Sequence, residues 1–184
     1  MKLLTAVNNI LPHLGENPVT SVDVRHPTVS LILDAIEEAK LNMLTQGWWF
    51  NTRDITLYPS SENEIFAPTN ILTFYCTDGQ LIDIRGDKMY DLQNGTYTIT
   101  KKVVGTIMDD LTFEELPTYA ALAVQYNAAH SVYTKDFGIE QTVRYLLEQE
   151  KNALMMLMQE ELRKKKYNSL KSSTAFRFVK ARHR

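Results

Sequence analysis

Disulfide bonds, long apolar runs and glycine-rich loops are all missing from this sequence of 184 residues. Because Cys76 is the one cysteine, the chain cannot form an internal disulfide or supply a cysteine-based zinc site. This excludes a small disulfide-held scaffold and favours folding in a reducing cytoplasm, with Cys76 as a buried structural thiol in an apolar stretch. No apolar run approaches the ~20 residues that a membrane-spanning helix needs, so we expect no membrane contact. The 7 glycines are scattered through turns and form no phosphate-binding loop.

Acidic residues are missing from the end of the chain, because no Asp or Glu follows Glu161. Nine of the 20 basic residues lie in this last segment, namely Arg163, Lys164, Lys165, Lys166, Lys171, Arg177, Lys180, Arg182 and Arg184. The other 11 share the rest of the chain with all 22 acidic residues. This asymmetry favours head-to-tail contact between copies, an acidic protein partner, or nucleic acid near the basic end.

Hydrophobic spacing predicts helices at both ends of the chain. The first spans residues 3–14 and contains Pro12, which predicts a kink or an early end because proline removes a helical hydrogen bond. The second spans about residues 28–46, with Glu37, Glu38 and Lys40 off its apolar stripe and towards solvent. The third begins after Pro117 and ends at Gly138, and its stripe runs from Tyr119 through His130 to Phe137.

The fourth predicted helix, about residues 140–167, has an apolar surface wider than one packing groove needs. Met155 and Met156 fall partly off its main stripe, which comprises Val143, Leu146, Leu147, Leu154, Leu157, Met158 and Leu162. Two interpretations remain open. The extra width meets a second partner such as a neighbouring subunit, or the helix is buried on two sides within its own bundle.

The middle of the chain is rich in β-formers. The run Trp48-Trp49-Phe50 predicts an extended segment buried on both faces, and strands are predicted at 53–58, 70–77, 81–85, 88–91 and 96–104. Asn94-Gly95 predicts a two-residue hairpin between the last two strands. We therefore expect an α+β protein. It is mainly a helical bundle of four helices (residues 1–50 and 112–167), with a small antiparallel β insertion (51–111) between the second and third helices and a basic C-terminal tail (168–184).

No residue pattern points to catalysis, a cofactor or a metal. The four histidines lack metal-ligand spacing, and the place of His130 on a helical stripe favours a packed, hydrogen-bonded residue. Folding could bring Asp109 and Glu115 together as the carboxylate pair that glycoside hydrolysis needs. The favoured interpretation is instead solvated acids and helix-start charges, so we expect no enzyme.

Several segments resemble tail tubular protein A of short-tailed bacteriophages. The sequence Ala6–Leu11 followed by Leu14–Val19 matches the opening of that family, and Gln46–Thr52 followed by Ile55–Leu57 matches its next part. Leu116-Pro117, Tyr119 and Ala128-Ala129 match the return to helix. The resemblance covers roughly residues 4 to 165 in the right order, with Pro12 as a departure.

The resemblance implies a structural virion protein without catalytic residues: a head-to-tail adaptor in the virion tail, assembled in the host cytoplasm. Members form a ring of twelve copies between the portal protein and a nozzle protein of the tail tubular protein B type. The ring surrounds the channel through which genomic DNA leaves. Our hypothesis is that the fourth helix and the nine basic residues from Arg163 to Arg184 dock on the portal. The alternatives are a tail-associated polysaccharide-degrading enzyme and a nucleic-acid-binding module acting through the basic tail.

Overall fold

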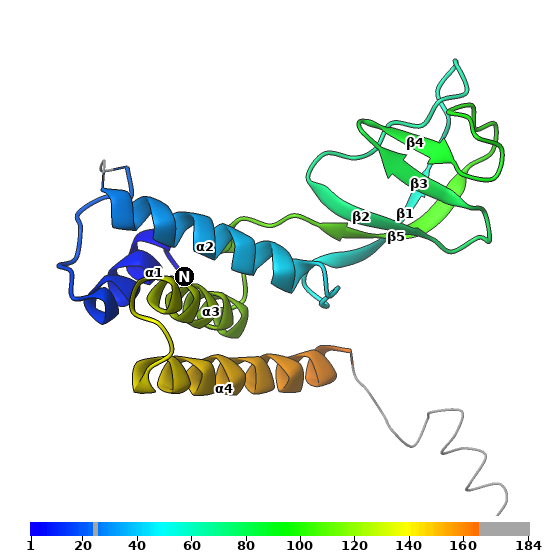
Figure 1. Cartoon of the computed structure of the whole chain (residues 1–184). Coiled ribbons are helices and arrows are strands. Elements are labelled where there is room, and N and C mark those ends of the chain that lie inside the picture. Colours follow the sequence, from blue (N-terminus) through cyan, green and yellow to red (C-terminus); the bar gives the residue numbers. More distant parts are fainter. Residues whose placement is uncertain (24–25, 166–184) are drawn as a thin grey trace, which may run out of the picture.

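The structure, a computed structural model, describes residues 1–23 and 26–165 (Figure 1). The α-helices within these residues are α1 (Leu3–Ile10), α2 (Pro27–Leu44), α3 (Thr118–Phe137) and α4 (Gln141–Lys164). The strands are β1 (Thr52–Leu57), β2 (Ile71–Cys76), β3 (Ile82–Arg85), β4 (Lys88–Asp91) and β5 (Val103–Asp109). Short 3-10 turns are η1 (Leu11–Leu14) and η2 (Phe113–Glu115). The strands lie between α2 and α3 in chain order, which confirms the predicted α+β class.

Pro12 ends the first helix early, as predicted. α1 stops at Ile10 and the chain continues as the 3-10 turn η1, because Pro12 has no N–H to donate to an α-helical hydrogen bond. Gly15 then adopts a left-handed conformation with φ 76°, and its N–H donates to the Pro12 carbonyl oxygen at 3.1 Å. The buried side of α1 contacts α2 and α3.

α3 is the central helix, because both α2 and α4 pack on it (Figure 1). It buries a set of small side chains, Ala120, Ala121, Ala123, Ala128 and Ala129, which allows close approach of the neighbouring helices. The predicted stripe of this helix is wrong at its ends, where Tyr119 and Phe137 are 39% and 50% exposed. A single apolar stripe is expected for a helix that packs on one side, whereas α3 packs against both α2 and α4.

The β region has its own hydrophobic core and lies beyond the C-terminal end of α2 (Figure 1). β1, β5 and β2 form an antiparallel sheet in that order, and β3 and β4 form a hairpin. Gly86, with φ 66°, and Asp87 make the two-residue turn of this hairpin. The core comprises Leu57, Ile65, Phe74, Ile82, Met89, Ile99, Val103 and Ile107. A separate cluster fills the helical part, so the two regions are joined mainly by the segments that run between them.

The last strand lies further along the chain than predicted. β5 spans Val103–Asp109 instead of residues 96–104, and it pairs with β1 on one side and β2 on the other. The two-residue hairpin predicted at Asn94-Gly95 is also wrong, because Gly95 has φ 68° and Asn94 does not have a positive φ. The Asp91 carboxylate accepts the Asn94 N–H at 3.0 Å and so closes a longer turn.

Candidate functional site

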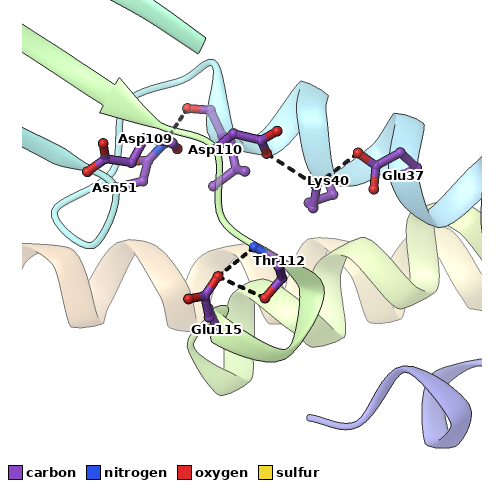
Figure 2. A network of polar contacts seen from close by, with 8 residues as sticks. Glu37, Lys40, Asn51, Asp109, Asp110, Thr112 and Glu115 are labelled. Atoms are coloured by element: carbon purple, nitrogen blue, oxygen red, sulfur yellow. Dashed lines mark hydrogen bonds and ion pairs between the residues drawn. The ribbon is translucent and has the colours of Figure 1, made fainter. Parts of the chain in front are cut away.

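Asn51 is buried where the helical and β regions meet (Figure 2). It is 1% exposed, and its Oδ1 accepts the Trp48 N–H at 2.9 Å. Its Nδ2 donates to the carbonyl oxygens of Leu44 at 2.8 Å and Asp109 at 3.3 Å. The Asp109 N–H in turn donates to the Asn51 carbonyl oxygen at 2.7 Å. Because Asn51 precedes β1 and Asp109 ends β5, these bonds tie the end of α2 to both strands.

The aromatic run before Asn51 forms a turn rather than the predicted extended segment. The Asn51 N–H donates to the Trp48 carbonyl oxygen at 3.2 Å, which closes the turn. Trp48 is buried, and its Nε1 donates to the Met43 carbonyl oxygen at 2.9 Å. Trp49 and Phe50 are only half-buried and pack edge to face. The turn therefore buries one aromatic ring against the helices instead of burying both faces of a strand.

Lys40 is a buried lysine at the same junction, which corrects the prediction that it points to solvent (Figure 2). Its Nζ lies 2.9 Å from the Glu37 carboxylate and 3.1 Å from the Asp110 carboxylate. Burial alone lowers the pKa of this ammonium, but the hydrogen bonds to Glu37 and Asp110 outweigh burial and raise the pKa above 10.5. Lys40 is therefore charged at neutral pH and holds α2 to the segment that follows β5.

The two carboxylates that the enzyme alternative needs are both engaged in structural contacts. Asp109 accepts two hydrogen bonds from Arg53, at 2.8 and 3.2 Å. Glu115 accepts the Thr112 N–H and hydroxyl, both at 2.8 Å, as the capping box that begins η2 (Figure 2). The Thr112 N–H bond, together with its hydroxyl bond, lowers the pKa of Glu115 below 4.5. A general acid for glycoside hydrolysis needs a raised pKa instead.

Two further sequence predictions concern single polar side chains. His130 is packed as predicted, with its Nε2 3.0 Å from the Glu150 carboxylate, and so it joins α3 to α4. The Cys76 thiol is half-buried instead of fully buried as predicted, and it donates to the Asp78 carboxylate at 2.9 Å. Burial and then this hydrogen bond raise the pKa of the thiol, whereas a reactive cysteine has a lowered pKa.

Neither a membrane span nor a metal cluster is found in the described part of the chain. No helix there is long and apolar enough to cross a membrane. No group of three or more His, Cys, Asp and Glu side chains in those residues could hold a metal ion.

α4 leaves much of its apolar surface uncovered. Val143, Leu146 and Leu157 are buried, whereas three other members of the predicted main stripe are exposed: Leu147 by 45%, Met158 by 51% and Leu162 by 53%. The stripe prediction is therefore wrong at those three positions. α4 packs on α3, and none of the described residues covers its other side. This contradicts burial on two sides among the described residues and favours a second partner.

The basic segment begins at the end of α4. Arg163, Lys164 and Lys165 are exposed, and Lys165 pairs with Glu161 at 2.6 Å. Arg163 and Lys164 border an open hollow that also includes Tyr119 of α3. The structure thus brings part of the predicted portal-docking set to one end of the helical region. The remaining predicted residues, Lys166, Lys171, Arg177, Lys180, Arg182 and Arg184, lie outside the described residues.

The sequence patterns did not indicate the buried polar contacts of Asn51 and Lys40 at the junction. Asn51 is part of the Gln46–Thr52 motif, so the motif marked its position but not its role. Lys40 lies one residue after Ala39 and three before Met43, which are both buried. A lysine beside buried stripe positions was a signal that it packs at the edge of the core.

The uncovered apolar side chains of α4 mark a surface for interaction with another protein. A model of the family described as tail tubular protein matches residues 4–167, and the chain belongs to that family. The chain is also 28% identical over 183 residues to "Tail tubular protein A" of Klebsiella phage KP34, covering 99% of this chain and 98% of that protein. The predicted resemblance is confirmed, and the chain is a structural component of a phage tail.

Proposed function

We propose that this chain is the head-to-tail adaptor of a short-tailed phage. A ring of twelve copies lies between the portal and the nozzle protein and surrounds the channel through which genomic DNA leaves. The main support is membership of the tail tubular family over residues 4–167, together with an uncovered α4 that ends in a basic segment.

The junction around Asn51 and Lys40 supports ring assembly. A closed ring repeats one contact between identical subunits, which requires every copy to have the same shape. Buried hydrogen bonds from Asn51 and the paired ammonium of Lys40 hold the β region against the end of α2. They therefore give each subunit one fixed arrangement of its two regions.

Within this function, the basic end of α4 and residues 168–184 dock on the portal. Arg163 and Lys164 are exposed, and no acidic residue follows Glu161 in the sequence. Positive charge concentrated at one end fits an acidic surface on the portal, and opposite charges set the register of a contact and speed encounter.

The first test is the mass of the complex formed when the purified protein is added to the portal ring of its phage. We expect saturation at about one copy per portal subunit, with a ring visible in electron micrographs. Protein that stays free of the portal at high concentration, under several salt conditions, refutes the adaptor function. Steeply salt-dependent binding to DNA in its place would favour the nucleic-acid alternative.

The docking residues are tested by a chain without residues 168–184 and by a full-length variant with Arg163→Gln and Lys164→Gln. We expect each change to weaken portal binding by roughly fivefold or more, and the loss to shrink in high salt because exposed charges are screened. The matched control is Lys101→Gln with Lys102→Gln, which removes the same charge from exposed positions of the β region. If the control binds the portal with the same affinity as the variant with Arg163→Gln and Lys164→Gln, the docking assignment is wrong.

A further inference from the structure

The exposed side of α4 forms one continuous row. The α4 stripe is defined as Leu147, Lys151, Leu154, Met155, Met158 and Leu162, which recur at three- and four-residue spacing and so lie along one side of the helix. Leu154 is half-buried and packs against the helical core, and the other members are exposed. Arg144 extends the row by one turn towards the start of the helix. Uncovered apolar side chains along several helical turns mark an interaction surface.

α2 carries an exposed row of its own. The α2 row is defined as Leu31, Asp34, Glu38 and Asn42 of α2 together with Thr45, the residue that caps its end, and their spacing also places them along one side of the helix. Leu31 is 51% exposed although the residue that follows it, Ile32, is fully buried. The α2 row is therefore an outer face with an apolar residue at one end and acidic residues in its centre.

The exposed charges of the two helices are opposite. Every exposed charged side chain of α2 is acidic: Asp34, Glu37 and Glu38. The lysine of this helix, Lys40, is buried and paired. Along α4 the exposed charged side chains are Arg144, Lys151, Arg163 and Lys164 against the single acidic Glu148. The two faces are thus complementary in charge, which favours a specific register.

These faces lie on opposite sides of the helical region. α2 and α4 both pack on α3, which lies between them (Figure 1). The α4 stripe and the α2 row of one copy therefore do not reach each other. They are available to two different neighbours, which is the arrangement that a head-to-tail ring requires.

We propose that the α4 stripe of one copy packs against the α2 row of the next copy, with Arg144 and Lys151 paired with Asp34 and Glu38. This inference rests on the proposed ring and names the two surfaces that build it. Leu147 and Met158 lose their exposure in the contact, and the basic end from Arg163 onwards stays available for the portal.

The test uses two full-length variants with opposite charge changes. The α4 variant carries Arg144→Glu and Lys151→Glu, and the α2 variant carries Asp34→Lys and Glu38→Lys. All four positions are exposed, so both variants should fold, which circular dichroism and the urea midpoint check. Self-association is measured by sedimentation over a wide range of protein concentration, and filling of the portal ring is measured by mass.

Each variant alone places like charges across the contact, so we expect its half-maximal assembly concentration to rise roughly tenfold or more. An equimolar mixture should assemble as the unchanged protein does. In the mixture, the acidic α4 of one variant meets the basic α2 of the other, and the unchanged faces pair at the next contact. The control, Lys101→Glu with Lys102→Glu, makes the same charge change as the α4 variant in the β region and should assemble normally.

Variants that assemble normally alone, or a mixture that fails to recover, overturn the inference. An unchanged protein that stays monomeric at every concentration, with and without the portal, also overturns it. If the unchanged protein self-associates and the mixture recovers but no copy binds the portal, the adaptor function fails and the α2–α4 contact stands.

Discussion

Replacing Asn51 with alanine tests whether the junction between the helical and β regions depends on one side chain. The change removes bonds of 2.9, 2.8 and 3.3 Å to three backbone groups, those of Trp48, Leu44 and Asp109. Asn51 is 1% exposed, so water does not easily replace its carboxamide. At about 1 kcal/mol for each lost bond, we expect Asn51→Ala to lower the free energy of unfolding by about 3 kcal/mol.

Asn51→Asp separates the loss of hydrogen bonds from the loss of volume. An aspartate keeps the size of the side chain and accepts the Trp48 N–H, but it turns a carboxylate oxygen towards the carbonyl oxygens of Leu44 and Asp109. We expect this variant to lose more stability than the alanine variant at neutral pH, because the second oxygen of a buried carboxylate then has no donor and faces two carbonyl oxygens. Burial raises the pKa of such a carboxyl in the folded state, so part of its stability should return on acidification.

Urea unfolding measured by tryptophan fluorescence is the appropriate assay, because the 2 tryptophans, Trp48 and Trp49, both lie at the junction. In thermal unfolding, 3 kcal/mol corresponds to a decrease in midpoint of roughly 6–12 °C for a chain of this size. The control is Asn152→Ala on α4, an exposed residue whose side chain makes no hydrogen bond to any other described residue. We expect that control to change stability by less than about 0.5 kcal/mol. A loss below about 1 kcal/mol for Asn51→Ala would refute our account of the junction.

Two further predictions concern the β region. At Gly105 a methyl group would lie 2.5 Å from the Tyr75 carbonyl oxygen, so Gly105→Ala should lower the free energy of unfolding by roughly 2 kcal/mol in a urea titration. The Cys76 thiol and the Val104 N–H, in that order, lower the pKa of the Asp78 carboxyl from 3.8 to about 2. The contribution of the Asp78 carboxylate to folding stability is therefore present above pH 3.8 and lost as the pH falls through about 2. Asp78→Asn should flatten this part of a plot of thermal midpoint against pH.

Each of these changes has a matched control. Gly79→Ala meets no atom within 4 Å and strains only the backbone, which has φ 84°. A loss for Gly105→Ala no larger than for Gly79→Ala contradicts the steric account. Asp87 is an exposed aspartate in the β3–β4 turn. If Asp87→Asn changes the acid profile as much as Asp78→Asn, the hydrogen bonds of Asp78 do not explain the acid sensitivity.

Features set by neighbouring residues could be predicted from the sequence. Pro12 and Gly15 ended the first helix where the missing N–H and the positive φ required it. Gly138 ended α3 for a similar local reason, with φ 79°. Motifs of six or seven residues, read in order along the chain, were sufficient to indicate the tail tubular family.

Features set by distant pairing could not be predicted in this way. β5 lies at Val103–Asp109 because it pairs with β1 and β2, which are remote in sequence, and alternation along 96–104 carries no information on either partner. The helical period places Lys40 at the edge of its stripe and shows Glu37 as a local partner, but not the second partner, Asp110, which lies 70 positions later in the sequence.

The sequence by itself determined the α+β class, the ends of several helices, the charge asymmetry and the family, because each follows from local spacing or composition. Only the tertiary structure decided which apolar residues of α4 stay uncovered. Helical periodicity groups Leu146 with Leu147, but α3 covers the first and leaves the second 45% exposed. The tertiary structure also brought Asn51 to the carbonyl of Asp109, across 58 positions in sequence. Contacts of that kind form only when the chain folds back on itself, so no local pattern encodes them.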